Sequence, residues 1–175
     1  MDHDVRPFRV GAQSYSFRKF GFEDAVRRLK ELGLEQMEFC RVHFLPDPDL
    51  PDLPRILATL AAEGIRVPCY GVEGFGADKE ANRRIFDFAQ RLGATVITAD
   101  PAPDSFDHLD RLCEEFAIKV AIHNHGPGAR YDRVEDTLKA VKDRSILRGP
   151  KLGRFGSTGW GRLSTLARRE LLPRG

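Results

Sequence analysis

Short apolar runs recur along the first 143 residues, and each is followed by a turn and then by an amphipathic segment. The starts of these runs lie roughly 24 to 30 residues apart, which is the combined length of a strand and a crossover helix. Short apolar runs bounded by turn residues are typical of buried strands. We therefore predict five strands, over residues 8–12, 36–40, 65–70, 94–99 and 118–123.

Between the predicted strands, apolar side chains recur at helical spacing, and each such stripe predicts a helix that packs on a sheet. A glycine follows each of the first three predicted helices, where a left-handed backbone costs glycine little; these are Gly33, Gly64 and Gly93. The stripes are Phe22, Ala25, Val26, Leu29 and Leu32; Ile56, Leu57 and Leu60; Ile85, Phe86, Ala89 and Leu92; Leu109, Leu112 and Cys113; and Val134, Leu138 and Val141.

This strict alternation of strands and helices predicts an α/β fold with a parallel sheet that is buried on both faces. Such a sheet is either closed into a barrel or open and doubly wound. A GxGxxG turn after the first strand would favour the open nucleotide-binding form. Residues 13–17 instead read Gln-Ser-Tyr-Ser-Phe, so the barrel is favoured.

Charge divides the chain into two parts. The chain has 175 residues, of which 41% are hydrophobic and 31% charged, and its net charge is +2. Residues 144–175 hold 8 of the 28 basic residues and 1 of the 26 acidic ones, so their net charge is +7 and that of residues 1–143 is −5. We therefore predict one globular part over 1–143 and a separate basic tail over 144–175.

The cysteine pattern and the amino-terminal residues indicate the compartment. The 3 cysteines include no CxxC pair, so neither a disulfide framework nor a cysteine zinc site is predicted. Neither a signal peptide nor a membrane span is evident. We expect a cytoplasmic protein that does not bind membranes.

Four segments together resemble the xylose isomerase-like barrels of the sugar phosphate isomerase/epimerase type. They are residues 10–16 (Val-Gly-Ala-Gln-Ser-Tyr-Ser), 37–39 (Met-Glu-Phe), 91–101, and above all 122–127 (Ile-His-Asn-His-Gly-Pro). The resemblance extends over residues 7 to about 143. It implies a (β/α)₈ barrel, which typically needs about 250 residues.

Only about five of the eight strand–helix units of such a barrel are visible in this sequence. The resemblance implies that later strands supply an aspartate, a histidine and a glutamate to a metal, and residues 154–161 contain neither aspartate nor histidine. Together with the change in charge, this predicts a partial barrel. The family sequence would then be lost near residues 151–153, with a tail that is frameshifted or disordered.

The candidate catalytic and metal-binding residues lie at the carboxyl ends of strands, where barrel enzymes place their active sites. The resemblance implies a divalent metal (Mn²⁺, Mg²⁺, Co²⁺ or Zn²⁺), with Asp100 and His123 as its ligands. It also implies catalytic roles for Glu38 and His125. Relatives most often carry glutamate at the position of Asp100. The alternatives are that Glu38 caps a helix or pairs with Arg41, and that Asp100 forms an Asx-turn.

Four further residues are candidates for binding a substrate. Tyr15, Ser16 and Tyr70 lie where a substrate hydroxyl could be bound, and His43 lies in the loop after the second strand. For the aromatic residues, the alternative is packing at the barrel rim.

The sequence thus predicts a metal-dependent isomerase or epimerase of a small sugar or polyol, incomplete and weakly active or inactive as this chain. The alternatives are a dehydratase or lyase of the same family, a non-catalytic remnant, or a nucleic-acid binder resembling apurinic-site endonucleases. Nucleic-acid binding is not expected, because the tail has only Phe155 and Trp160 as aromatic residues. Self-association through the open sheet edges is expected.

Overall fold

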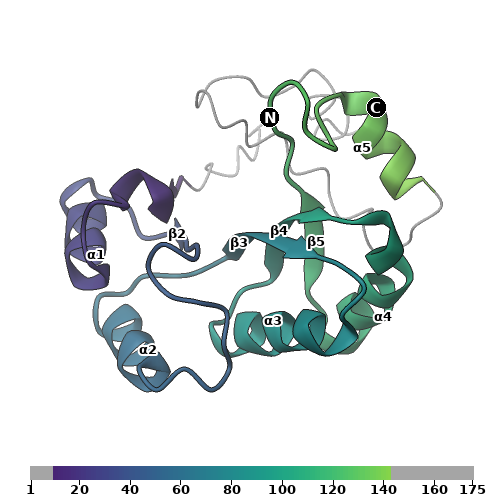
Figure 1. The fold of residues 1–175 in the computed structure, drawn as a ribbon. Helices are drawn as coiled ribbons and strands as arrows, with labels where there is room; N and C mark the ends of the chain where they lie inside the picture. The colour runs from purple at the N-terminus through teal and green to yellow at the C-terminus, as the bar shows by residue number, and fades with distance from the viewer. Residues whose placement is uncertain (1–9, 143–175) are drawn as a thin grey trace, which may run out of the picture.

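The structure, a computed structural model, describes residues 10–142 and alternates strands with helices throughout (Figure 1). The strands are β1 (Ala12–Gln13), β2 (Met37–Glu38), β3 (Cys69–Phe75), β4 (Val96–Pro101) and β5 (Lys119–Ile122). The helices are α1 (Phe22–Glu31), α2 (Leu53–Ala62), α3 (Lys79–Arg91), α4 (Phe106–Phe116) and α5 (Val134–Val141), with short 3₁₀ turns η1 (Ser14–Phe17) and η2 (Pro103–Ser105).

All strand pairs are parallel, and their order in space follows the chain. One sheet pairs β1 with β2, and the other has the order β3-β4-β5. Two isolated parallel bridges, Gln36 with Arg66 and Phe39 with Tyr70, join β2 to β3. The strands form an arc, and α1, α2, α3 and α4 follow its outer side in Figure 1. The predicted α/β fold, a partial (β/α)₈ barrel with five strand–helix units, is confirmed.

The core lies between the arc of strands and the helices. Its centre is aromatic: the rings of Phe44 and Tyr70 stack at 6.0 Å, and Phe88 of α3 meets Tyr70 edge-on at 5.2 Å. Alternate residues of the strands, such as Met37 and Ile97, are fully buried in this layer. The predicted helical stripes supply the other side, with two exceptions. Leu32, at the end of α1, is exposed, and on α5 no residue is buried.

The predicted helix ends are confirmed. Gly33, Gly64 and Gly93 have φ values of 71°, 66° and 81°, the left-handed conformation expected just past a helix. At the other end of α3, the carboxylate of Asp78 accepts hydrogen bonds from the backbone N–H groups of Glu80 and Ala81. This cap fixes where α3 begins after the loop that follows β3.

The third strand lies later in the chain than predicted. Residues 65–70 were expected to form it, whereas β3 begins at Cys69 and continues to Phe75, whose partner in the register is Pro101. Ile65 and Val67 are buried as predicted, but they precede the strand, and Pro68 between them and Cys69 has no backbone N–H to donate to a ladder.

The outer edges of β1 and β5 pair with no other strand among residues 10–142. Self-association through these edges stays a prediction. The proposed change of reading frame near 151–153 and the basic tail over 144–175 lie outside the described residues. Within the described part of the chain, no helix combines the length and hydrophobicity needed to span a membrane.

Candidate functional site

Glu38 and Thr98 lie on the face of the strands that points away from the helices. Met37 and Phe39 are fully buried in the helix-facing core, so Glu38 between them points to the opposite face. The same alternation in β4 places Ile97 and Ala99 in the core, and Thr98 on the face that Glu38 occupies. In a closed barrel this face lines the interior, where catalytic side chains gather at the carboxyl ends of the strands.

Glu38 is joined to Thr98 across this inner face. The Thr98 hydroxyl donates a 2.5 Å hydrogen bond to Oε1 of Glu38. Burial raises the pKa of the Glu38 carboxyl from 4.5 to about 7, and the Thr98 hydrogen bond opposes this rise. A carboxyl with a pKa near neutrality can both accept and return a proton at physiological pH. Neither alternative for Glu38 is observed among residues 10–142. Arg41 pairs with Glu73, and no helix there is capped by the Glu38 side chain.

Asp100, His123 and His125 lie at the carboxyl ends of β4 and β5. The rings of His123 and His125 are 4.5 Å apart and edge-to-face. Burial lowers the pKa of His123, His125 lowers it further, and Asp100 opposes both. The Asp100 carboxylate forms a 3.6 Å ion pair with Arg130. The structure thus brings together the two predicted imidazoles and places an arginine, which the sequence did not suggest, beside Asp100.

The loop between β5 and α5 is held against β4 next to these residues. The Tyr131 hydroxyl donates a 2.6 Å hydrogen bond to the carbonyl oxygen of Pro101. The Asn124 side chain donates to the Tyr131 carbonyl oxygen and to the Thr137 hydroxyl, at 3.0 and 2.8 Å. Asn124, between the two histidines, therefore holds the loop in place through its side-chain NH₂ group.

The residues predicted as metal ligands do not form a metal site by themselves. Among residues 10–142, no three His, Cys, Asp or Glu side chains converge closely enough to hold a metal ion. Asp100 faces the cationic guanidinium of Arg130, which competes with a cation for the carboxylate. The divalent metal implied by the resemblance stays a prediction, and no step proposed below depends on it.

The other predicted substrate residues lie near the carboxyl ends of β1 and β2. Tyr15 and Ser16 are exposed on η1, and the guanidinium of Arg18 covers the Tyr15 ring at 4.7 Å. His43 is half-buried, and its ring meets Phe39 edge-on at 5.9 Å. Burial lowers the pKa of His43, so its neutral form is favoured. Contact of these three residues with a substrate stays a prediction.

Tyr70 is a core residue, and the prediction that it binds substrate is wrong on geometric grounds. Its side chain is fully buried, and its hydroxyl already donates a 2.7 Å hydrogen bond to the carbonyl oxygen of Phe44. Burial and the nearby Glu73 carboxyl raise its pKa. The hydroxyl serves to hold the loop that contains Phe44.

Replacing Tyr70 by Phe is expected to lower the free energy of unfolding by about 1 kcal/mol, because the Phe44 carbonyl oxygen loses its hydrogen bond. Urea unfolding measures this change. The exposed Tyr15 offers a matched control, and Tyr15→Phe should leave the free energy of unfolding unchanged. A Tyr70→Phe variant as stable as the wild-type protein would show that the hydroxyl does not anchor the loop.

Besides Arg130, two residues of importance here were not found from the sequence. Glu73 is buried, and Arg41 binds both of its carboxylate oxygens, with Nε at 3.0 and 2.9 Å and Nη2 at 2.6 Å from Oε2. Thr98 is the second. A glutamate in an otherwise apolar strand was a signal for Glu73, but its partner lies 32 residues away. No pattern in the sequence pointed to Thr98.

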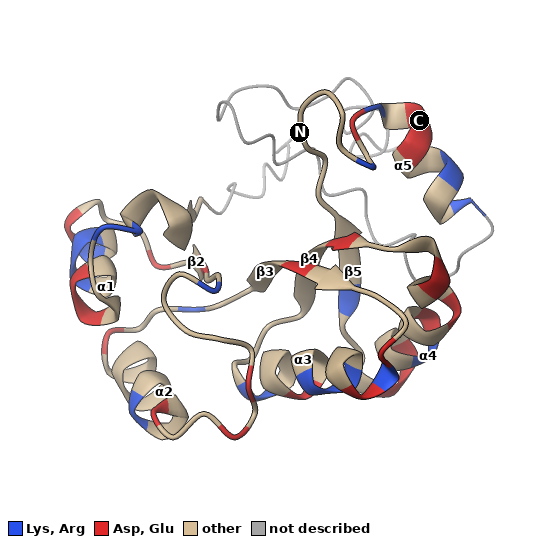
Figure 2. Ribbon diagram, viewed as in Figure 1, with Lys and Arg blue, Asp and Glu red and all other residues tan. Residues whose placement is uncertain are grey.

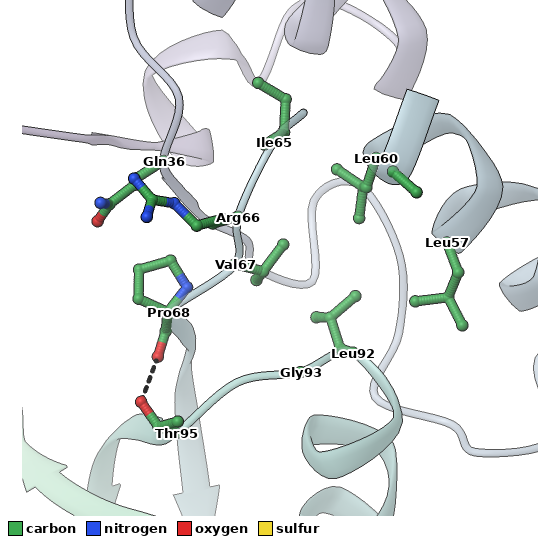
Figure 3. Close-up of a pocket in the computed structure, with 11 residues that line it drawn as sticks. Gln36, Leu57, Leu60, Ile65, Arg66, Val67, Pro68, Leu92, Gly93 and Thr95 are labelled. Carbon is green, nitrogen blue, oxygen red and sulfur yellow. Dashed lines mark hydrogen bonds between the residues drawn. The ribbon is translucent and has the colours of Figure 1, made fainter. Parts of the chain in front are cut away.

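A hollow of about 450 Å³ opens at the opposite end of the strands (Figure 3). It is lined by apolar side chains of α2 and of the segment before β3, with Gln36, Arg66 and Thr95 as its polar residues. None of the predicted site residues lines it. Since barrel enzymes place their chemistry at the carboxyl ends, we do not assign the active site to this hollow.

Comparison with solved structures supports the fold. An uncharacterised protein from Parabacteroides distasonis matches over 90% of this chain with a TM-score of 0.69 and 25% identity. D-psicose 3-epimerase, crystallised in the presence of D-fructose, matches over 79% with a TM-score of 0.56 and 14% identity. A xylose isomerase domain protein from Alicyclobacillus acidocaldarius matches over 82%, also with a TM-score of 0.56, and is 13% identical.

The matches extend over 67%, 60% and 61% of the lengths of these three proteins. No family model and no curated protein matches the sequence. The structural neighbours therefore show that the described residues adopt the fold of sugar isomerase- and epimerase-like barrels.

Proposed function

We propose that this chain carries the acid–base part of a sugar isomerase- or epimerase-like active site, with a small sugar or polyol as its substrate. The observation that carries the proposal is the Glu38 carboxyl, whose pKa of about 7 is set by burial on the inner face of the strands. The neighbouring sugar epimerase and xylose isomerase domain protein support the substrate class through their shared fold.

The proposed chemistry is the transfer of a proton at the carbon beside a carbonyl. Ionised Glu38 takes the proton from this carbon, the C–H electron pair forms the carbon–carbon double bond of an enediolate, and the carbonyl oxygen receives the negative charge. In an isomerisation, Glu38 then returns the proton to the neighbouring carbon, which was the carbonyl carbon. The hydroxyl proton on the first carbon moves to the charged oxygen, so that the former carbonyl becomes a hydroxyl and the first carbon becomes the new carbonyl. Return to the same carbon from the other face, by a second group, gives an epimer.

His125 is the proposed partner of Glu38 in this reaction. It follows β5 with an exposed side chain, and its ring contacts that of His123. An imidazole N–H at this position can donate a hydrogen bond to the carbonyl oxygen on which charge develops. A divalent metal, for which Asp100 and His123 are the predicted ligands, would supply Lewis-acid chemistry when bound. We propose that the chain is weakly active, since among residues 10–142 no three His, Cys, Asp or Glu side chains converge to hold a metal ion.

Proton exchange with solvent tests this function without requiring a complete turnover. The full chain would be incubated in D₂O with neutral and phosphorylated ketoses, in EDTA and with added Mn²⁺, Mg²⁺, Co²⁺ or Zn²⁺. Slow loss of the ¹H NMR signal at the carbon beside the carbonyl is the expected result. If no sugar exchanges under any of these conditions, the proposal is wrong and the non-catalytic alternative is favoured.

A further inference from the structure

The contact between Glu38 and Thr98 spans a third strand. Glu38 is on β2 and Thr98 on β4, while β3 runs between them. Neighbouring strands lie about 4.8 Å apart, so side chains two strands apart are separated by about 9.6 Å of sheet. Any side chain on the intervening strand that pointed to the same face would block the contact.

Gly71 of β3 leaves this space open. A Cβ at Gly71 would lie 2.3 Å from both the carbonyl and the hydroxyl oxygen of Thr98, and the φ value of 147° is one that side chains rarely adopt. On its other side, the carbonyl oxygen of Gly71 accepts a 3.5 Å hydrogen bond from Nε2 of Gln13. Four strands thus contribute to one polar cluster, which consists of Gln13, Glu38, Gly71 and Thr98.

The Thr98 hydroxyl has no role in packing that a methyl group could not fill. Thr98 is 3% exposed, and its hydroxyl donates to Glu38. Because a buried hydroxyl costs free energy unless it is hydrogen-bonded, valine would be the favoured residue here if only shape mattered. The hydroxyl is explained by the carboxyl that it binds.

We propose that Thr98 is a positioning residue for Glu38: its hydroxyl holds Oε1, through the opening left by Gly71, and leaves Oε2 to face the substrate. Among the described residues, Oε2 accepts no hydrogen bond. The proposal rests on the function assigned to Glu38 above. It makes Thr98 the residue that fixes which carboxylate oxygen reacts and how readily it ionises.

The electrostatic consequence follows from the direction of the hydrogen bond. A hydroxyl that donates to a carboxylate stabilises its charged form, so Thr98 lowers the pKa of Glu38 while burial raises it. Among residues 10–142, Cys69 on β3 is a titratable group whose charge interacts with that of Glu38, and burial raises the pKa of its thiol, so that Cys69 is neutral near pH 7. Replacement of Thr98 therefore changes the pKa of Glu38 directly, and the neutral Cys69 thiol adds no charge beside it.

The test is the titration of the Glu38 carboxyl in the full chain, followed by ¹³C NMR on glutamate-labelled protein. The signal is assigned by its absence in Glu38→Gln. The wild-type midpoint is expected near 7, and Thr98→Val should raise it by about one to two units, since a hydrogen bond to a charged group is lost. Thr98→Ser, which keeps the hydroxyl, should return the midpoint to the wild-type value.

Two controls separate an effect of the lost hydroxyl from an effect of misfolding. Amide spectra would establish that each variant is folded, and Thr98→Ala, which adds no bulk, replaces Thr98→Val if the latter does not fold. A midpoint unchanged by loss of the hydroxyl would overturn the proposal. This titration needs no substrate, so a failure of the proton-exchange assay refutes the proposed function and leaves the role of Thr98 to be decided separately.

Discussion

Replacing Glu38 by Gln is expected to lower the rate of proton exchange at the sugar carbon by about 10²- to 10⁴-fold, because the general base is lost. The amide has the shape of the carboxyl, and its oxygen can still accept the Thr98 hydrogen bond, so the fold should be kept. The measurement is the ¹H NMR exchange rate in D₂O.

The same substitution at the exposed Glu63, which follows α2, is the matched control and should leave the exchange rate unchanged. Equal rates for Glu38→Gln and the wild-type protein would remove Glu38 from the mechanism. In that case another group on the inner face, such as His125, would have to be the base.

Replacing Arg41 by Ala is expected to lower the free energy of unfolding at pH 7 by about 3 kcal/mol, because Glu73 is left as a buried carboxyl without a partner. The value is taken at the lower end of the usual range because the Arg41 side chain is 52% exposed, whereas that of Glu73 is fully buried. Urea unfolding of both proteins measures the difference.

The pH dependence of this loss has a definite sign. Burial raises the pKa of Glu73, and Arg41 opposes the rise. Without Arg41 the folded protein should bind a proton at Glu73 more tightly than the unfolded chain does, so its stability is greatest below the unfolded pKa and falls as pH rises through the folded value. Arg41→Ala should therefore be least stable, relative to wild type, at neutral pH.

Two variants separate this explanation from a general loss of packing. Glu73→Gln in the Arg41→Ala background should recover part of the stability at pH 7, because no charge remains to be buried. Arg27→Ala, which removes an arginine that pairs with Asp24 and Glu31 on the surface of α1, should leave stability close to that of the wild-type protein. A pH-independent loss in Arg41→Ala would contradict the assignment.

Most ion pairs of the described residues lie on the surface of the helices, unlike the Arg41–Glu73 pair. Lys and Arg are interspersed with Asp and Glu along α1 and α3 (Figure 2). Pairs such as Arg83 with Glu115, which connects α3 to α4, are exposed at both ends. Only the Arg41–Glu73 pair among the ion pairs of residues 10–142 has a fully buried partner.

The alternation of strands and helices was predictable because each unit carries its own pattern. The helical stripe of α1 and the glycine after it, for example, are both local, and Gly33 has the expected left-handed backbone. The bounds of β3, in contrast, depend on residues that are distant in the sequence. Its end is set by pairing with β4 through Pro101, and nothing in residues 71–75 marks them as a continuous strand.

The error in β3 explains the error at Tyr70. If the strand ended at Tyr70, this residue would lie at the rim, where a substrate could reach it. Because β3 continues to Phe75, Tyr70 lies near the beginning of the strand and points into the aromatic core. The direction of the Tyr70 side chain could not be predicted correctly from the wrong bounds of β3.

The position of Glu38 was predictable, but its environment was not. A glutamate that ends a strand of a parallel barrel lies at the carboxyl edge whatever its neighbours are. Its contact with Thr98, 60 residues away, depends on the register of three strands and on the absence of a side chain at Gly71. The same holds for Arg130 beside Asp100, which depends on the path of the loop after β5.

The most direct test of the central claim is the pH dependence of proton exchange, measured between pH 4 and 9 on the wild-type chain. If Glu38 acts as the base, the rate should rise with pH and level off above an apparent pKa near 7, which is the value that burial gives this carboxyl. Thr98→Val should move this midpoint upward. A rate that is already level above pH 5, as an exposed carboxylate would give, would contradict the account.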